Sequence, residues 1–219
     1  MTGRLGRQAT CITPPEELAR THGASYAKKF LRRATRSEHA AAEQTAVMRA
    51  LFDEKLGSAA YIRLLQGYHA LYAKWEHHHA AWLLGDLKNS GWQYQTRLRA
   101  IESDLYELGA QPTQPRFSAN ELALIQPALD TDPASWGSLY VIEGSALGGQ
   151  IIARTLTTEF PNHPHLFFRL GHGKNRASWK DFQVVMAVQL GNATSRRAIA
   201  LQARAAFGVF QHMLDGVMR

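Results

Sequence analysis

The sequence has few of the residues and patterns on which several large classes of protein depend. Its 219 residues contain one cysteine, Cys11, which excludes an internal disulfide and any metal site built from several thiolates. A lone thiol of this kind suits a reducing compartment, so we expect a cytoplasmic protein. No run of about eighteen apolar residues is present, so we expect no membrane-spanning helix. The N-terminal stretch MTGRLGRQATCITPPEELARTHG has no apolar core of the kind that secretory signals carry.

Familiar catalytic and nucleotide-binding motifs are also missing. The chain has no G-x-S-x-G turn, no P-loop and no dinucleotide fingerprint. Its 25 Lys and Arg residues exceed its 18 Asp and Glu residues, and the formal charge of +7 favours an anionic partner. Nucleic acid is one candidate, but the basic residues are scattered and no nucleic-acid-binding motif accompanies them. An acidic small molecule or an acidic redox protein fits the charge as well, and we expect no nucleic-acid partner.

The alternation of apolar and polar residues that marks β-strands is absent, whereas helical spacing is frequent. We therefore predict an all-α fold of six to eight helices in a single domain, 25–219, preceded by a flexible tail, 1–24. Asp132 and Pro133 form a typical helix start, and Pro161 ends that helix. The other predicted helices span 25–52, 58–84, 92–108, 118–129, 177–190 and 193–217.

Four functional side chains share one face of the first predicted helix. Arg32, Arg36, His39 and Glu43 stand at positions i, i+4, i+7 and i+11 of LRRATRSEHAAAE. Two guanidinium groups can bind two carboxylates, and a neutral imidazole can ligate a metal. Glu43, one turn beyond His39, can accept the other ring N–H and fix the tautomer. The alternative is a solvated face of i, i+4 ion pairs.

Gly144, Gly148 and Gly149 interrupt the middle of a largely apolar helix, SWGSLYVIEGSALGGQIIARTL. Each costs about 1 kcal/mol of helix propensity relative to alanine. Gly144 and Gly148 share a face, and Ser145 and Gly149 share the neighbouring strip. Two interpretations remain open: a close helix–helix contact, or a flat ligand pressed against the helix backbone.

The stretch WEHHHAAW contains a further candidate metal motif. Glu76 and His79 form one Glu-x-x-His pair, which is half of the motif found in di-iron bundles. No second pair of this kind occurs in the chain. We therefore interpret this stretch as a solvated helix face rather than a metal site.

The order of these motifs resembles the heme oxygenase family, in its bacterial form, which includes members found beside bacteriophytochromes. LRRATRSEH is similar to the family's proximal segment, in which the histidine at the position of His39 ligates heme iron. YVIEGSALGGQII is similar to the distal-helix motif, and GHGKNRASWKDF resembles a bacterial stretch before the penultimate helix. The resemblance covers about residues 25–217 and implies a heme oxygenase-like helical bundle.

The resemblance also implies roles for individual residues. Basic residues at the positions of Arg32, Arg36 and Lys180 would anchor the heme propionates, and Phe207 stands where the family often has a pocket aromatic. The implied catalytic residues are His39, Gly144, Ser145 and Gly148. The implied heme-binding residues are Arg32, Arg36, His39, Glu43, Gly144, Gly148, Gly149, Lys180 and Phe207.

Two positions depart from the family pattern. Vertebrate-type members carry an aspartate where this chain has Ser145, so their distal water network does not carry over unchanged. A second basic residue that the family can place four positions after Lys180 is replaced here by Val184. Both differences concern how heme and its distal water are held.

The implied activity is oxidative heme cleavage. Heme b would be both substrate and cofactor, and O₂ with an external electron donor would convert it to biliverdin, CO and ferrous iron. Ferredoxin, a flavoprotein reductase or ascorbate are the implied donors, and a bacteriophytochrome is a possible recipient of biliverdin. The alternative is a protein on the same fold that binds or handles heme without turnover.

Overall fold

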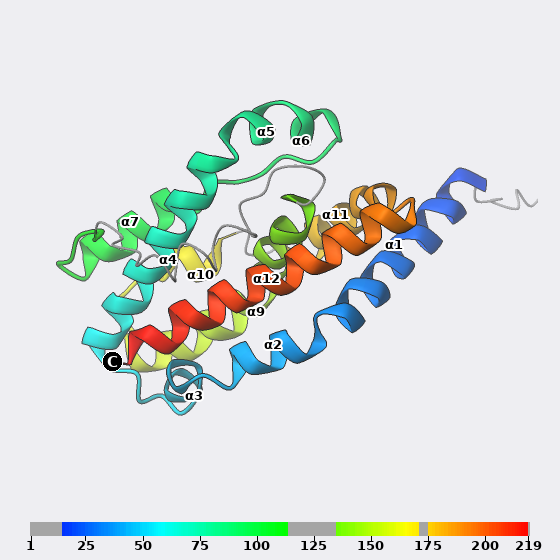
Figure 1. The fold of residues 1–219 in the computed structure, drawn as a ribbon. Coiled ribbons are helices and arrows are strands. Elements are labelled where there is room, and N and C mark those ends of the chain that lie inside the picture. The colour runs from blue at the N-terminus through cyan, green and yellow to red at the C-terminus, as the bar shows by residue number, and fades with distance from the viewer. Residues whose placement is uncertain (1–14, 114–134, 171–174, 219) are drawn as a thin grey trace, which may run out of the picture.

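The structure, a computed structural model, describes the backbone of residues 15–113, 135–170 and 175–218. No β-strand occurs in these ranges, which confirms the all-α prediction (Figure 1). The helices are α1 (Pro15–Ala34), α2 (Arg36–Glu43), α3 (Ala46–Phe52), α4 (Ser58–His78), α5 (Ala80–Leu84), α6 (Asp86–Asn89), α7 (Leu98–Glu107), α9 (Ser135–Glu159), α10 (Leu166–Arg169), α11 (Asn175–Gln189) and α12 (Ala193–Val217).

The first helix begins earlier than the sequence predicts. Helix α1 starts at Pro15, whereas the predicted tail extended to residue 24. Proline is well tolerated in the first turn of a helix, because the N–H group that it lacks would have no partner there. Residues 1–14 lie outside the described residues, so the division of the chain into a tail and a domain stays a prediction.

The single helix predicted over 25–52 is divided into three by two threonines. The hydroxyl of Thr35 donates to the carbonyl oxygen of Leu31 at 2.9 Å, and that of Thr45 donates to Ala42 at 3.0 Å. Such side-chain bonds to a preceding carbonyl compete with the regular helix ladder and bend it. The chain turns at both threonines, and α1, α2 and α3 follow one another in different directions (Figure 1).

The helix predicted over 92–108 begins only at Leu98. Glu76 of α4 accepts hydrogen bonds from the Tyr94 hydroxyl at 2.9 Å, the Thr96 hydroxyl at 2.6 Å and the backbone N–H of Arg97 at 3.0 Å. These bonds hold the preceding residues in a non-helical course along α4. The predicted helix at 118–129 and the predicted helix start at 132–133 lie outside the described residues.

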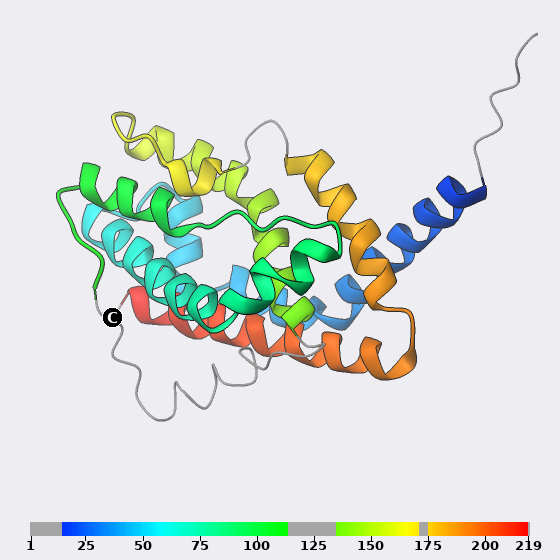
Figure 2. The ribbon, with the colours of Figure 1, turned by 90° about the horizontal axis from the view of Figure 1, so that it is seen from above.

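The core is organised around two 25-residue helices, α9 and α12, which pack closely against each other. A Cβ atom on Gly137 would lie 2.3 Å from the carbonyl oxygen of Ile199 and 2.7 Å from the backbone nitrogen of Ala203. Only glycine permits this approach of the two backbones. Helix α1 packs along α11, and its N-terminal end extends away from the other helices in both ribbon views (Figures 1 and 2).

Candidate functional site

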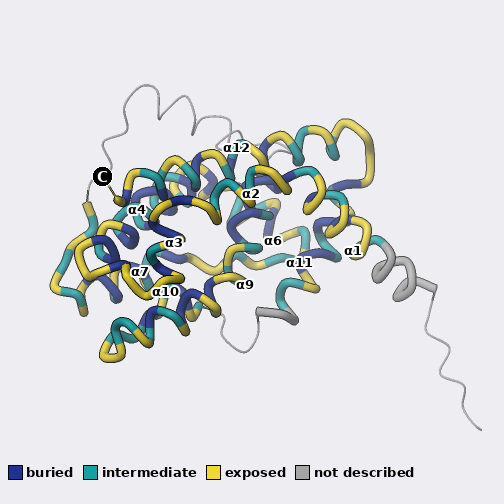
Figure 3. The backbone as a smooth tube through the Cα atoms, turned by 90° about the horizontal axis from the view of Figure 1, so that it is seen from below, coloured by how far each residue is buried: buried dark blue, intermediate teal, exposed yellow. Residues whose placement is uncertain are grey.

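A cavity of about 980 Å³ opens between α1 and α2 on one side and α9 on the other, and α10, α11 and α12 complete its walls. In the view of Figure 3, the backbone of α2 lies above that of α9. The volume lies at the upper end of the range of about 300–1,000 Å³ that is usual for small-molecule and cofactor sites. Both constellations predicted from the sequence therefore line one cavity.

The four predicted residues of the first constellation, Arg32, Arg36, His39 and Glu43, all line this cavity. The bend at Thr35 leaves them on a common side because helical geometry resumes at once in α2. The structure thus supports a concave binding site here rather than a plain solvated helix face.

His39 is held by two neighbours and leaves one ring nitrogen for a ligand. Its Nδ1 lies 3.4 Å from Oε2 of Glu43, and its ring meets the ring of Phe207 edge-on at a centroid distance of 5.4 Å. The His39 side chain is 55% exposed. A histidine that directs Nδ1 toward a carboxylate keeps Nε2 available for a metal, and the carboxylate increases the basicity of that nitrogen.

Helix α2 is held against α12 by a charged contact. The guanidinium of Arg204, on α12, donates to Oε1 of Glu38, the residue next to His39. This contact and the Phe207 ring fix α2 from the same helix. Phe207 therefore supports His39, in agreement with its predicted place in the pocket.

The three predicted glycines face different surroundings. A Cβ atom on Gly148 would meet no atom within 4 Å, so the backbone there borders open space of the cavity. A Cβ atom on Gly144 would lie 3.4 Å from the Trp179 indole, and one on Gly149 would lie 2.8 Å from the carbonyl oxygen of Phe168. Gly148 thus suits a ligand, whereas Gly149 also serves the packing of α9 against α10.

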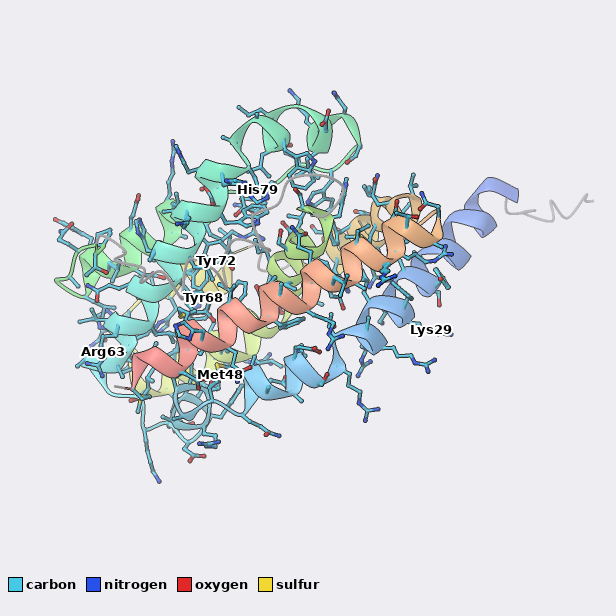
Figure 4. All side chains as sticks on the ribbon, viewed as in Figure 1. Lys29, Met48, Arg63, Tyr68, Tyr72 and His79 are labelled. Carbon is cyan, nitrogen blue, oxygen red and sulfur yellow. The ribbon has the colours of Figure 1, made fainter. Side chains whose placement is uncertain are left out.

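Ser145 is exposed and lines the cavity beside these glycines. Its hydroxyl donates to the carbonyl oxygen of Ile142 at 2.7 Å, so the oxygen of Ser145 remains an acceptor. The hydroxyl of Tyr72, on α4, forms a side-chain hydrogen bond with Ser145, and burial raises the pKa of Tyr72 to about 12. Tyr68 and Tyr72 lie one turn apart on α4 and both line the cavity (Figure 4).

The cationic residues of the cavity differ in part from those predicted. Lys180 is exposed on α11 and is not among the lining residues, whereas its neighbour Trp179 is. Lys28, Lys29 and Arg33 do line the cavity, although sequence reasoning missed them. The stretch KKFLRRATR was the available signal, since its five cations recur at three- and four-residue intervals on one helix.

A buried ion pair was also missed. Arg97 is 5% exposed and lines the cavity, and its Nη2 lies 3.2 Å from Oε1 of Glu143 on α9. Nothing in the local sequence indicates this pairing, because Arg97, directly before α7, and Glu143, on α9, are brought together only by the fold.

The interpretation of WEHHHAAW as a solvated face is wrong for two of its residues. Glu76 binds the 94–97 segment, as described above, and His79 is fully buried with Nδ1 donating to the carbonyl oxygen of Trp75 at 2.9 Å. Burial lowers the pKa of His79 to about 4. Among the described residues no group of three or more His, Cys, Asp or Glu side chains could hold a metal ion.

Comparisons with known proteins agree with this geometry. A family model described as heme oxygenase matches residues 25–216. The chain is 36% identical over 175 residues to a heme oxygenase from Xanthomonas campestris pv. campestris (strain 8004), which covers 79% of this chain and 99% of that protein. The chain belongs to the heme oxygenase family.

Solved structures share the fold. Heme oxygenase from Leptospira interrogans aligns with a TM-score of 0.71 at 19% identity, over 87% of this chain and 98% of that one. Heme oxygenase-1 from the cyanobacterium Synechocystis sp. PCC6803, in complex with heme, aligns with a TM-score of 0.71 at 17% identity, over 89% and 91% of the two chains. In the part of this chain that the structure describes, every helix is too short or too polar to cross a membrane.

Proposed function

We propose that this protein cleaves heme oxidatively to biliverdin, CO and ferrous iron, using O₂ and an external electron donor. The observation that carries the proposal is the shared cavity, which His39 and the cationic ends of α1 and α2 face from one side and the glycine segment of α9 from the other. Membership of the heme oxygenase family supports it independently.

The cavity fits a heme group in both size and chemistry. Its volume of about 980 Å³ suits a large planar ligand, and the open space at Gly148 allows such a ligand to approach the helix backbone. An imidazole, His39, is available on the other side. The apolar part of the wall is supplied by Phe167, Phe168, Phe207 and Phe210, among other residues.

The cations at the cavity mouth would hold the two propionates. Arg32 and Arg36 are one turn apart, and each guanidinium can bind a carboxylate with two parallel hydrogen bonds. Lys28, Lys29 and Arg33 line the same wall and would add to the attraction. The exposed Lys180 would contribute from a greater distance, because it lies outside the cavity lining.

Heme would supply the iron at which O₂ is bound and reduced. His39 would bind this iron through Nε2, and Glu43 would keep its Nδ1 protonated. Because Gly144 and Gly148 have no side chains, the α9 backbone could approach the ring closely. The narrow space between backbone and ring would then orient a small ligand toward the ring edge. Ser145, whose hydroxyl donates to the Ile142 carbonyl and interacts with the Tyr72 hydroxyl, would hold a water molecule for proton delivery.

The same proposal includes partners and location. The formal charge of +7 suits an acidic electron donor such as a ferredoxin or a flavoprotein reductase, and ascorbate can replace it in vitro. The biliverdin would be available to a bacteriophytochrome. The single cysteine favours a cytoplasmic site of action.

Mixing the purified protein with hemin, O₂ and ascorbate tests the proposal. We expect a Soret band that forms and then decays into the broad red absorption of biliverdin. A Soret band that forms and persists would show a protein that binds heme without turnover. Replacing His39 with alanine should remove the iron ligand, and added imidazole should restore the original spectrum if the cavity remains intact.

A further inference from the structure

The cavity wall carries a buried charge pair that the heme-anchoring residues do not use. Arg97, the residue before α7, lines the cavity, whereas Glu143, directly before Gly144 on α9, is not among the lining residues. Their side chains are 6% and 12% exposed and 3.2 Å apart. The pair therefore has its positive member at the wall and its negative member behind it.

The groups around the pair fix the guanidinium in place. The ring of Tyr94 lies 4.7 Å from the Arg97 Cζ atom, and Glu76 binds both the Tyr94 hydroxyl and the Arg97 backbone N–H. Burial alone would lower the pKa of Arg97, but the Glu143 carboxylate raises it above its usual value. The guanidinium is therefore a permanent charge held in one position.

Tyr72 connects this pair to the glycine segment. Its hydroxyl interacts electrostatically with Arg97, Glu143 and Glu76, and it faces Ser145 on α9. Because its pKa is raised by burial, the hydroxyl stays protonated and can act as a donor. These residues, with Tyr94, are the charged and titratable groups that face the pair from α4, the 92–97 segment and α9.

A buried ion pair of this kind is weak evidence of a role in stability. Apolar residues of similar size often replace such pairs at no cost, so their presence beside a cavity is better explained by the field they produce. In a dry cavity that field is poorly screened.

We propose that Arg97 and Glu143 form a fixed dipole whose positive end faces the cavity beside α9, where it favours negative charge on the ligand of the bound heme. Arg97 is then a positioning residue, which acts through the potential it creates and through the Tyr72 hydroxyl. The proposal rests on the proposed function, because heme is the group on which the charge would be felt.

The test measures the protein reconstituted with ferric heme. Its absorption spectrum is followed against pH to find the midpoint, the pH at which half of the protein has lost one proton from the ligand of the heme. Its affinity for fluoride, a small anion, is measured by titration. In E143Q the guanidinium loses its counter-charge, so we expect the midpoint to fall by about half a pH unit or more and fluoride to bind more tightly. In the double variant R97M/E143Q the positive end is gone, so the midpoint should rise and fluoride should bind more weakly.

Opposite shifts in these two variants separate an electrostatic role from a structural one. R97K keeps the charge and should stay close to the unaltered protein, and R99E, an exposed position on α7 outside the cavity, is the control for remote charge. The double variant leaves neither ion of the pair unpaired, so it can still be measured if E143Q unfolds. In that case, a midpoint in the double variant equal to that of the unaltered protein would be enough to overturn the proposal. Shifts in the same direction, or none, would also overturn it. Failure of the unaltered protein to bind hemin would instead contradict the proposed function.

Discussion

Gly144, Gly148 and Gly149 face a tryptophan ring, open space and a peptide carbonyl, respectively. Helix propensity treats them alike, at about 1 kcal/mol each. The open space beside Gly148 suits the proposed ligand, whereas the close contact of Gly149 with Phe168 is a matter of helix packing. The same motif therefore serves two purposes that substitution can separate.

We predict opposite effects for alanine at the two adjacent glycines. G148A should raise the free energy of unfolding of the ligand-free protein by up to about 1 kcal/mol, because alanine favours helix and its methyl group enters open space. The same methyl should weaken hemin binding or slow its turnover. G149A should lower the free energy of unfolding by about 1–3 kcal/mol, because its Cβ would lie 2.8 Å from the Phe168 carbonyl oxygen.

Urea unfolding of the ligand-free variants, followed by hemin titration, measures both effects. If G148A bound and degraded heme as the unaltered protein does, the face of the heme would not lie against Gly148.

At the level of elements, the short helix α10 depends on a single carboxylate from α7. Asp104 is buried, and its two oxygens accept the backbone N–H groups of Leu166 and Phe167, each at 2.8 Å. His165, directly before α10, has a φ of 52°; its Nε2 donates to the Phe160 carbonyl oxygen at 3.1 Å, and its Nδ1 accepts a hydrogen bond from the Tyr61 hydroxyl at 2.8 Å. These bonds place the aromatic residues of α10 in the cavity wall.

Replacing Asp104 with alanine should therefore loosen both the fold and the cavity. We expect D104A to lower the free energy of unfolding by about 1–3 kcal/mol, because two N–H groups of α10 lose their acceptor. Hemin should also bind more weakly, since α10 supplies Phe167 and Phe168 to the wall. E107A, at an exposed position on the same helix, is the matched control and should change neither quantity; equal effects in both variants would refute the role given to Asp104.

Across the whole molecule, buried histidines make the folded state sensitive to acid. The pKa of His79 is lowered by burial to about 4, against about 6.5 in an unfolded chain, and burial also lowers the pKa of His165. Between these two values the unfolded state binds more protons than the folded one. The contribution of these histidines to the free energy of unfolding then decreases as pH falls from about 6.5 toward 4.

Substituting His79 with phenylalanine should remove its share of this pH dependence. Between pH 7.5 and pH 5 the unaltered, ligand-free protein should lose about 2 kcal/mol through His79, and H79F should lose correspondingly less. Urea unfolding at the two pH values measures the difference. H77F, at an exposed position two residues away, should keep the full dependence, and an H79F protein as acid-sensitive as the original would contradict the assignment.

The distribution of charge over the whole molecule should govern how fast hemin is captured. Five cations, Lys28, Lys29, Arg32, Arg33 and Arg36, line one side of the cavity, and hemin carries two carboxylates. We expect the association rate to fall as salt is raised, and R33E to reduce it several-fold at low salt. Stopped-flow mixing measures this rate. R99E makes the same charge change on α7, and equal slowing by both variants would show that only net charge matters.

The sequence by itself determined the fold class and one half of the site. Helical periodicity without strand alternation specified an all-α chain, because local spacing alone decides which faces can be buried. Arg32, Arg36, His39 and Glu43 could be found because residues close in sequence share a helix face wherever the helix packs. The glycine segment could be found because glycine in a helix has a cost that needs an explanation.

Only the tertiary structure decided which of these residues meet and what each one does. Gly148 faces open space, whereas the adjacent Gly149 faces a peptide carbonyl. Arg33 borders the cavity, whereas Lys180, a cation that the sequence also offered, does not. The pairing of Arg97 with Glu143 has no local signal, because attraction between residues far apart in the sequence depends on a distance that packing alone creates. For the same reason the half-buried Glu76 and the fully buried His79, whose polarity predicted a solvated face, have partners that local sequence cannot name.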